Sequence, residues 1–237
     1  MNFKGVSVIT CTNRENFIDN VFENFNRQNY KFKELIIIIN DNNIDKSLYD
    51  EKCKNHKDIR VYQINQASNL GFCLNFGIKK AKKNVIAKFD DDDYYGEKYL
   101  DECMEAFNST NADIVGKYTF FIYFENNNAL ALRKRSQENS FVTNIAGATL
   151  AFKESVFKKI KFNTSLKAGV DTDFRKRALK NGFKIYSTSK YNFVVHRHAN
   201  SREHTWKIED SELLKAFPII EYTNDYRKIV SPFEPNL

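Results

Sequence analysis

The first half of the chain alternates short apolar runs with amphipathic stretches. The apolar runs have the length of strands and cover residues 6–10 (VSVIT), 34–40 (ELIIIIN), 59–64 (IRVYQI) and 84–89 (NVIAKF). The run at 34–40 is apolar on both faces, as in a buried parallel strand. Between the runs, helical spacing marks Phe17, Ile18, Val21, Phe22 and Phe25, then a weak helix at 46–54, then Leu70, Leu74, Ile78 and Ala81, and finally Leu100, Cys103, Met104 and Phe107. This alternation predicts an open, mostly parallel, three-layer α/β sheet.

The second half has a less regular pattern. We expect strands at 113–124, 147–152, 184–188 and 192–196, a short helix at 153–160, and a longer helix at 170–183 that ends at Gly182. The polar and basic stretch 125–140 is predicted to be a mobile loop. The tail from about residue 205 carries Trp206 and many other aromatic residues, so we expect it to pack on the domain or on a partner.

The length and the net charge limit the number of domains and the kinds of partner that this chain can have. The chain has 237 residues, a length that suits one large domain, and a formal net charge of +7. That charge suits a protein that meets anions, although a lysine-rich solvated surface explains it equally well. The lysines are spread along the chain and no nucleic-acid-binding motif occurs, so no nucleic-acid partner is predicted.

Cysteine usage and the apolar runs bear on the compartment. The four cysteines lack metal-ligand spacing and are predicted to be reduced core residues; they are Cys11, Cys53, Cys73 and Cys103. No apolar run has the length of a signal peptide or a membrane span. The sequence therefore predicts a cytoplasmic protein.

Three polar segments follow predicted strands, at residues 10–14 (TCTNR), 40–43 (NDNN) and 90–93 (DDDD). Ligands of open α/β sheets bind outside the carboxyl ends of the strands, so these segments mark a candidate site. In the first of them, Thr12 followed by Glu15 is typical of a helix capping box.

The four consecutive aspartates indicate a cation site. Side chains alternate along an extended segment, which sends Asp90 and Asp92 one way and Asp91 and Asp93 the other. Carboxylates without cysteine favour Mg²⁺, Mn²⁺ or Ca²⁺, and the run lacks the glycine and glutamate of an EF-hand loop. The alternative is a solvated acidic turn that caps a helix starting near Glu97.

Three segments resemble a known family when they are taken together in order and spacing. They are VSVITCTNRENFIDNVFENFNRQNYKFKELIIIINDNN, NLGFCLNFGIKKAKKNVIAKFDDDDYYGEKYL and GVDTDFRKRALKNGFKIYS. These segments resemble family 2 glycosyltransferases with the GT-A fold, a Rossmann-like α/β/α sandwich, over about residues 5–196. The resemblance implies inverting transfer of a sugar from a nucleotide-diphosphate donor, with a D-x-D motif that binds Mn²⁺ or Mg²⁺.

The resemblance also assigns residues to the donor. It implies that Asp92 binds the metal ion directly and that Asp90 contacts the ribose or a metal-bound water. His196 is a further candidate ligand, with His198 and His204 as alternatives. The nucleotide-binding set is Thr10, Thr12, Asn13, Asp41, Asn69, Asn75, Asp90 and Asp91. Leu74 stands where many relatives have a basic residue, which departs from the family pattern.

The catalytic base is assigned to Asp171. The family has a Glu-Asp pair at the start of a helix, and here the pair is Val170-Asp171, so the aspartate alone is retained. One carboxylate is sufficient to take the proton of an acceptor hydroxyl; capping of the helix is the other role open to Asp171. The acceptor and donor-sugar set is Gly147, Ala148, Asp173 and Arg175.

These assignments divide the chain. Residues 1–204 form the predicted GT-A domain, with a nucleotide-binding half at 1–110 and an acceptor-binding half at 111–204, and 205–237 form an aromatic extension. The expected donor is a UDP-sugar or another nucleotide sugar, and the acceptor is a glycan, a lipid-linked sugar or a protein, as in polysaccharide biosynthesis. For the extension three alternatives stay open: contact with the inner face of a membrane, contact with a second copy, or neither.

Two other functions stay open at this point. The first is a nucleotidyltransferase, which shares the α/β layout and acidic metal ligands but needs a glycine-rich loop near the first strand, where TCTNRENF has no glycine. The second is a non-catalytic module that binds a nucleotide or a metal ion, an alternative that the departures at Leu74 and Val170 leave open.

Overall fold

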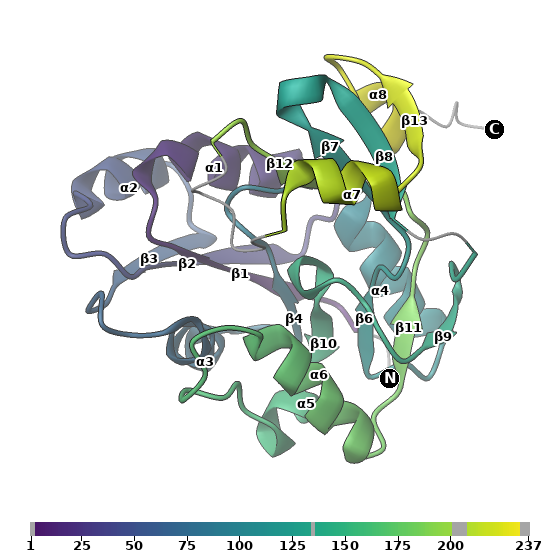
Figure 1. Cartoon of the computed structure of the whole chain (residues 1–237). Helices are drawn as coiled ribbons and strands as arrows, with labels where there is room; N and C mark the ends of the chain where they lie inside the picture. Colours follow the sequence, from purple (N-terminus) through teal and green to yellow (C-terminus); the bar gives the residue numbers. More distant parts are fainter. Residues whose placement is uncertain (1–2, 134–135, 201–207, 233–237) are drawn as a thin grey trace.

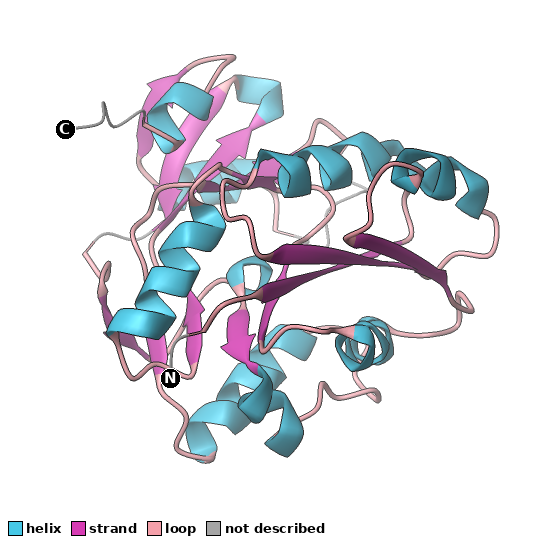
Figure 2. Cartoon of the chain, turned by 180° about the vertical axis from the view of Figure 1, so that it is seen from behind, coloured by secondary structure: helices cyan, strands magenta, loops and turns pink. Residues whose placement is uncertain are grey.

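The structure is a computed structural model that describes residues 3–133, 136–200 and 208–232. A central sheet lies between two layers of helices, and a smaller sheet stands at one end of the molecule (Figure 1). Seen from behind, the strands of the central sheet run between helices on both faces (Figure 2). The predicted three-layer α/β architecture is confirmed.

Among the described residues the central sheet has eight strands, in the order β3-β2-β1-β4-β10-β6-β11-β9. They are β1 (Val6–Thr12), β2 (Lys33–Ile39), β3 (Ile59–Gln63), β4 (Val85–Lys88), β6 (Ile114–Gly116), β9 (Ser140–Val142), β10 (Ala151–Lys153) and β11 (Ile185–Ser187). The strands β3, β2, β1 and β4 pair in parallel, and so do β6 and β11. The carboxyl ends of the first four strands therefore meet at one edge.

The side chains of the central strands alternate between two apolar cores. In β2, Leu35, Ile37 and Ile39 enter one core, while Ile36 and Ile38 enter the other. The helices over the first core are α1 (Ile18–Arg27), α2 (Lys46–Cys53) and α4 (Tyr99–Ser109), and those over the second are α3 (Leu70–Lys80), α5 (Glu154–Lys159) and α6 (Val170–Lys180). Burial on both faces explains why the sequence of β2 is continuously apolar.

Strand β10 joins the two halves of the sheet. It runs antiparallel to both β4 and β6, with Ala151 opposite Ala87 and Val115. The predicted strand at 147–152 is therefore shifted, because residues Gly147–Thr149 form a short 3-10 helix (η3) and only the following residues pair. This places η3 beside the end of β4.

The smaller sheet has the order β13-β8-β7-β12-β5 in the described part of the chain. Its strands are β5 (Tyr94–Tyr95), β7 (Phe120–Phe124), β8 (Ala129–Arg133), β12 (Phe193–Arg197) and β13 (Ile219–Tyr222). The prediction of a loop over 125–140 is wrong at β8, which forms a hairpin with β7. The hairpin turns through the 3-10 helix η2 (Glu125–Asn127) and Asn128, which has the left-handed conformation that asparagine tolerates.

The last described segment, residues 208–232, packs on this smaller sheet. Helices α7 (Asp210–Ala216) and α8 (Arg227–Val230) flank β13, which pairs with β8. Tyr226 and Val230 are buried in the apolar cluster of that sheet. Trp206 lies outside the described residues, and the domain boundary at 204 stays a prediction.

Three further expectations concern membrane spans, the start of α1 and the cysteines. No helix within the described ranges is long and apolar enough to cross a bilayer. The predicted capping box at Thr12 is wrong, because α1 follows a 3-10 turn (η1, Glu15–Phe17) whose cap position, Arg14, makes no side-chain capping bond. All four cysteines are free; two are buried and two are half-buried.

Candidate active site

The ends of β1 and β4 meet through their side chains. The hydroxyl of Thr12 donates a 2.6 Å hydrogen bond to Asp91 Oδ2, across 79 positions of the sequence. The segment at 40–43 meets the first one through the backbone, where the N–H of Asn40 donates to the carbonyl oxygen of Thr12 at 2.9 Å, while the Asp41 carboxylate accepts hydrogen bonds from the backbone and side chain of Asn43. The structure thus joins two of the three polar segments through side-chain contacts.

The aspartate run is bent, so the expected strict alternation of its side chains is wrong. Arg14 forms ion pairs with both Asp91 and Asp92, at 2.9 Å from Asp92 Oδ2. The side chains nonetheless differ in access: Asp90 and Asp92 are 33% and 18% exposed, and Asp91 is 5% exposed. The two aspartates that the family resemblance assigns to the metal are therefore the accessible ones.

Helix α1 holds the backbone of this run. Asn20 donates to the carbonyl oxygens of Asp91 and Asp93, and the buried Asn24 donates to Asp93 O at 2.8 Å. Asn24 also accepts the backbone N–H of Tyr95. The run is therefore fixed by two asparagines, one helical turn apart, that sequence reasoning missed.

Burial makes the run costly to ionise. It raises the pKa of Asp91 to about 6, with Asp92 adding to the shift and Arg14 opposing it. Burial is also the largest cause of the raised pKa values of Asp92 and Asp93. Carboxylates in this state gain stability from a cation beside them.

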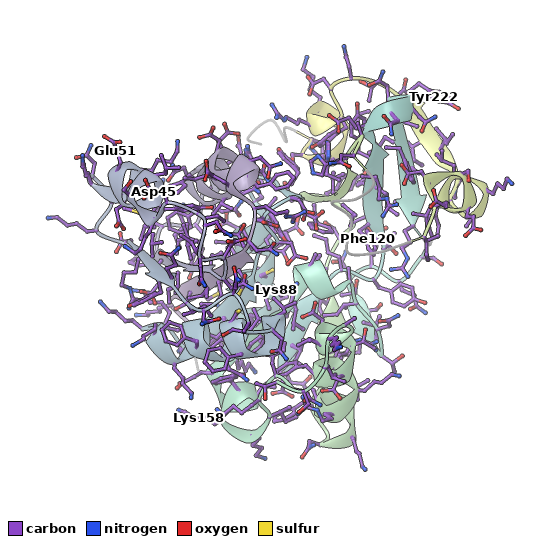
Figure 3. The ribbon with its side chains drawn as sticks, turned by 60° about the vertical axis from the view of Figure 1, so that its left-hand side comes forward. Asp45, Glu51, Lys88, Phe120, Lys158 and Tyr222 are labelled. Atoms are coloured by element: carbon purple, nitrogen blue, oxygen red, sulfur yellow. The ribbon has the colours of Figure 1, made fainter. Side chains whose placement is uncertain are left out.

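Lys88 is a second cation that the sequence analysis missed. Its ammonium lies 2.5 Å from Asp90 Oδ1 and 3.1 Å from Asp171 Oδ2, and the side chain is buried. Burial alone lowers the pKa of Lys88, but Asp171 and Asp90 outweigh burial and raise it. Lys88 lies at the centre of the molecule (Figure 3). It is therefore a charged residue that links the aspartate run to the predicted base.

Asp171 lies in the first turn of α6, against the turn η3. The cap position of α6 is Gly169, so the capping alternative for Asp171 is wrong. A Cβ atom at Gly147 would lie only 2.7 Å from Asp171 Oδ2. Burial raises the pKa of Asp171; Lys88 lowers it and Asp90 raises it. Asp171 Oδ1 is buried without a hydrogen-bond partner, which is rare for a carboxylate oxygen inside a protein.

The hydroxyl of Tyr95 joins the two sides of this site. It accepts the backbone N–H of Asp90 at 2.8 Å and donates to the carbonyl oxygen of Ala148 at 2.8 Å. The ring is buried and stacks on Phe89. The position of Asp90 relative to η3 is thus set by a rigid aromatic side chain.

The other residues assigned to the nucleotide have structural contacts. Asn69 caps α3 by accepting the N–H of Phe72, and Asn75 both donates to and accepts from the backbone of Phe162. Thr10 is buried within β1, and Asn13 is exposed beside Thr12. These contacts give Asn69 and Asn75 structural roles, and the assignment of both residues to the nucleotide stays a prediction.

Asp173 and Arg175 lie on α6 with partners of their own. Asp173 pairs with Arg177 at 2.6 Å, and Arg175 donates to the carbonyl oxygen of Thr143 at 2.7 Å. Their assignment to the acceptor or donor sugar stays a prediction.

The accessible carboxylates fit a hard divalent cation. Asp90 and Asp92 offer oxygen donors, which Mg²⁺ and Mn²⁺ prefer, next to aspartates that burial and mutual repulsion keep hard to ionise. His196 donates its backbone N–H to Asp93 Oδ1 at 3.0 Å, and its ring Nδ1 lies 3.1 Å from His198 Nδ1. His204 lies outside the described residues.

An acidic run at the carboxyl edge of a three-layer, mostly parallel sheet is the architecture of GT-A glycosyltransferases. The chain belongs to glycosyl transferase family 2, whose family model matches residues 7–183. Comparison with curated protein sequences finds no match.

Solved structures agree on the fold. TarS 1-349 from S. aureus has a TM-score of 0.64 and 19% identity, over 81% of this chain and 60% of that chain. Its complex with UDP-GlcNAc aligns equally well, over 83% and 59%. The mannosyltransferase PcManGT from Pyrobaculum calidifontis, in complex with GDP-Man and Mn²⁺, has a TM-score of 0.65 and 14% identity, over 86% and 59%. This chain thus spans about three fifths of the length of these neighbours.

Proposed function

We propose that the chain is a metal-assisted, inverting glycosyltransferase that uses Asp171 as its general base. The donor is a nucleotide-diphosphate sugar, with a UDP-sugar as the first choice, and the acceptor is a hydroxyl of a glycan, a lipid-linked sugar or a protein. The observation that carries the proposal is the placement of Asp171: its carboxylate shares Lys88 with Asp90 and keeps one buried oxygen unpartnered.

The proposed step moves one proton and exchanges one bond. Asp171 takes the proton of the acceptor hydroxyl as that oxygen forms a bond to the anomeric carbon from the face opposite the diphosphate. The bond between the anomeric carbon and the diphosphate oxygen breaks, and the nucleoside diphosphate leaves with the electron pair. A raised pKa makes Asp171 a better proton acceptor than an exposed aspartate.

Asp90 and Asp92 would hold the divalent cation. Mn²⁺ or Mg²⁺ there would neutralise charge on the leaving diphosphate. Arg14 lies beside Asp91 and Asp92, where its guanidinium is also suited to a phosphate oxygen. The solved neighbours support this donor class, since TarS binds UDP-GlcNAc and PcManGT was captured with GDP-Man and Mn²⁺.

The test compares Asp171→Asn with the unaltered chain. Release of nucleoside diphosphate from a panel of donors, with Mn²⁺ and candidate acceptors, should fall at least ~100-fold, the lower range for a positioned base. Binding of UDP with Mn²⁺, measured by calorimetry, should stay within a factor of about 2 because Asp171 is assigned to the acceptor hydroxyl.

Glu154→Gln is the matched control, because Glu154 is a carboxylate in α5 that pairs with Lys158. It should turn over normally. Full transfer by Asp171→Asn would exclude Asp171 as the base, and loss of UDP binding in that variant would assign Asp171 to the donor.

A further inference from the structure

Lysines gather at the amino edge of the central sheet, opposite the edge that carries the aspartate run. The chain enters the parallel strands β1, β2, β3 and β4 through residues 3–5, 29–33, 55–58 and 79–84. These segments contain eight lysines and one acidic residue, Asp58, a net charge of +7 that equals that of the whole chain. The lysines, called the basic edge below, are Lys4, Lys31, Lys33, Lys57, Lys79, Lys80, Lys82 and Lys83.

Strand pairing joins the four segments into one surface. The order β3-β2-β1-β4 sets them side by side, with neighbouring strands about 5 Å apart. The N–H of Val6 donates to Phe32 O at 3.0 Å, and the N–H of Lys83 donates to the hydroxyl of Ser7 at 3.2 Å. Six of the eight lysines are exposed and two are half-buried. The lysines therefore act together on whatever approaches this edge.

The nearest carboxylates compensate only part of this charge. The buried Glu34 pairs with Arg60 at 2.6 Å, so its charge is already matched. Asp101, half-buried on α4, offsets part of the charge of Lys31 and Lys33. The basic edge thus keeps a strong positive charge.

An aromatic side chain protrudes from the basic edge. Phe32 is 66% exposed between Lys31 and Lys33, and its ring meets that of Tyr30 edge-on, with 6.4 Å between the centroids. An exposed ring gains free energy when it moves from water into apolar surroundings. Lysines around a protruding aromatic ring are suited to an anionic bilayer, because the cations meet the headgroups while the ring enters the interface.

We propose that the basic edge docks on a bilayer that contains anionic lipids, with Phe32 inserted at the level of the headgroups. Each lysine near such a surface strengthens binding roughly 5-fold, and the apolar contact of Phe32 adds to this. Nucleic acid fits this surface less well. Bases are read mainly by arginine forks, whereas the eight cations here are lysines and Arg60 is paired with Glu34.

Docking in this way determines where the candidate active site faces. Strand β1 runs from Val6 at the basic edge to Thr12, whose hydroxyl contacts Asp91, a span of about 20 Å at 3.3 Å per residue. Anionic headgroups attract the basic edge and repel the aspartate run at the far end of β1. The site therefore opens away from the lipid, toward acceptors that extend into solution.

The experiment measures sedimentation of the whole chain with vesicles of phosphatidylglycerol and phosphatidylcholine, at about 0.1 M salt, where the Debye length is about 10 Å. The chain should bind these vesicles, leave pure phosphatidylcholine vesicles unbound, and dissociate as the salt rises toward about 1 M. A quadruple variant should bind roughly 100-fold more weakly, because four lysine contacts are lost. Its substitutions, all at exposed positions, are Lys4→Gln, Lys31→Gln, Lys79→Gln and Lys82→Gln.

The matched control removes four exposed lysines elsewhere and so loses the same total charge. Its substitutions are Lys167→Gln, Lys176→Gln, Lys215→Gln and Lys228→Gln. It should bind within about 3-fold of the unaltered chain, since charges further than a Debye length from the lipid are screened. Phe32→Ser should weaken binding roughly 10-fold, while Phe141→Ser, which alters another exposed aromatic residue, should not.

The proposal would be overturned by absent binding to phosphatidylglycerol vesicles, by equal binding to pure phosphatidylcholine, or by equal losses in the two quadruple variants. Unchanged binding of Phe32→Ser would exclude the insertion of its ring. A single-stranded DNA oligonucleotide that displaces the vesicles and binds more tightly than they do would assign the basic edge to nucleic acid instead. Sugar transfer is not measured, so failure here is distinct from failure of the proposed function.

Discussion

Lys88 lies between the proposed ion site and the proposed catalytic base and contacts a carboxylate of each. One carboxylate that it contacts, Asp90, belongs to the proposed ion site, and the other, Asp171, is the proposed base. Both contacts neutralise charge in a buried setting, where an unpaired ion is costly. The lysine therefore lowers the pKa of Asp171, against the larger effect of burial.

Replacing Lys88 with methionine should shift the pH profile of transfer. Lys88 lowers the pKa of Asp171, so its removal raises that pKa, and a larger share of Asp171 is then protonated at a given pH. The acidic limb of the kcat/KM profile should move to higher pH, with activity recovering as the pH rises.

The control for Lys88→Met is Asp171→Asn, whose loss of activity should not recover at high pH. Removing one partner of a buried ion pair costs about 3–5 kcal/mol, so thermal unfolding must first show that Lys88→Met is folded. An unshifted acidic limb in the folded variant would mean that Asp171 does not govern it.

Gly147 tests the contact between η3 and the base. The methyl group of Gly147→Ala would lie 2.7 Å from Asp171 Oδ2 and 2.9 Å from Asp171 Cβ. Asp171 must then shift, and a displacement of about 1 Å in a catalytic group costs on the order of 100-fold in rate. Steady-state kinetics should show a lower kcat with UDP affinity retained; an unchanged kcat would show that the contact yields without cost.

The sequence alone predicted the carboxylates of the site but not the two basic residues that pair with them, Lys88 and Arg14. The aspartate run and Asp171 can be recognised in the sequence because one is a run of consecutive acidic residues and the other is an acidic residue at the start of a predicted helix. Lys88 is the one charged residue in the apolar run 84–89, a signal that the sequence offers, while Arg14 looks like an ordinary turn residue. Whether Arg14 reaches Asp91 or solvent depends on the path of the turn after β1.

Among the elements, α1 has the most direct effect on the site. Its apolar face covers the sheet, and its adjoining edge presents Asn20 and Asn24 to the aspartate run. Sequence periodicity predicted the helix and its buried face. The asparagines were not predicted, because hydrogen bonds to a distant backbone leave no periodic trace.

Asn24→Ala should destabilise the run more than a helix substitution usually does. It removes the bond to Asp93 O and leaves the backbone N–H of Tyr95, buried in the structure, without its partner. We expect a loss of about 2–3 kcal/mol in the free energy of unfolding, together with weaker Mn²⁺-dependent UDP binding.

Asn26→Ala is the control within the same helix, because Asn26 is exposed. Its free energy of unfolding should change by less than about 0.5 kcal/mol. Equal losses in the two variants, measured by urea denaturation, would mean that Asn24 contributes only helix propensity.

For the whole molecule, the sequence predicted the layer order but not the second sheet. Strands β1 to β4 were legible because buried parallel strands are continuous apolar runs. Strand β8 could not be recognised in this way. Its apolar run, Ala129–Leu132, is short and lies between an asparagine-rich turn and a basic segment. Strand β8 pairs with its sequence neighbour β7 on one side and with β13, which lies far along the chain, on the other.

Strand β10 gives the molecule a built-in length standard. Its pairing places Lys88 N 2.9 Å from Leu150 O, one residue beyond η3, so the register of β10 against β4 sets the separation of Gly147 from Asp90. A slip of one residue would shift this alignment by about 3.3 Å and reverse the side chains. The distance between the aspartate run and η3 is therefore determined by the alignment of β10 with β4. Mutagenesis that changes only the polar residues of the site does not alter this alignment.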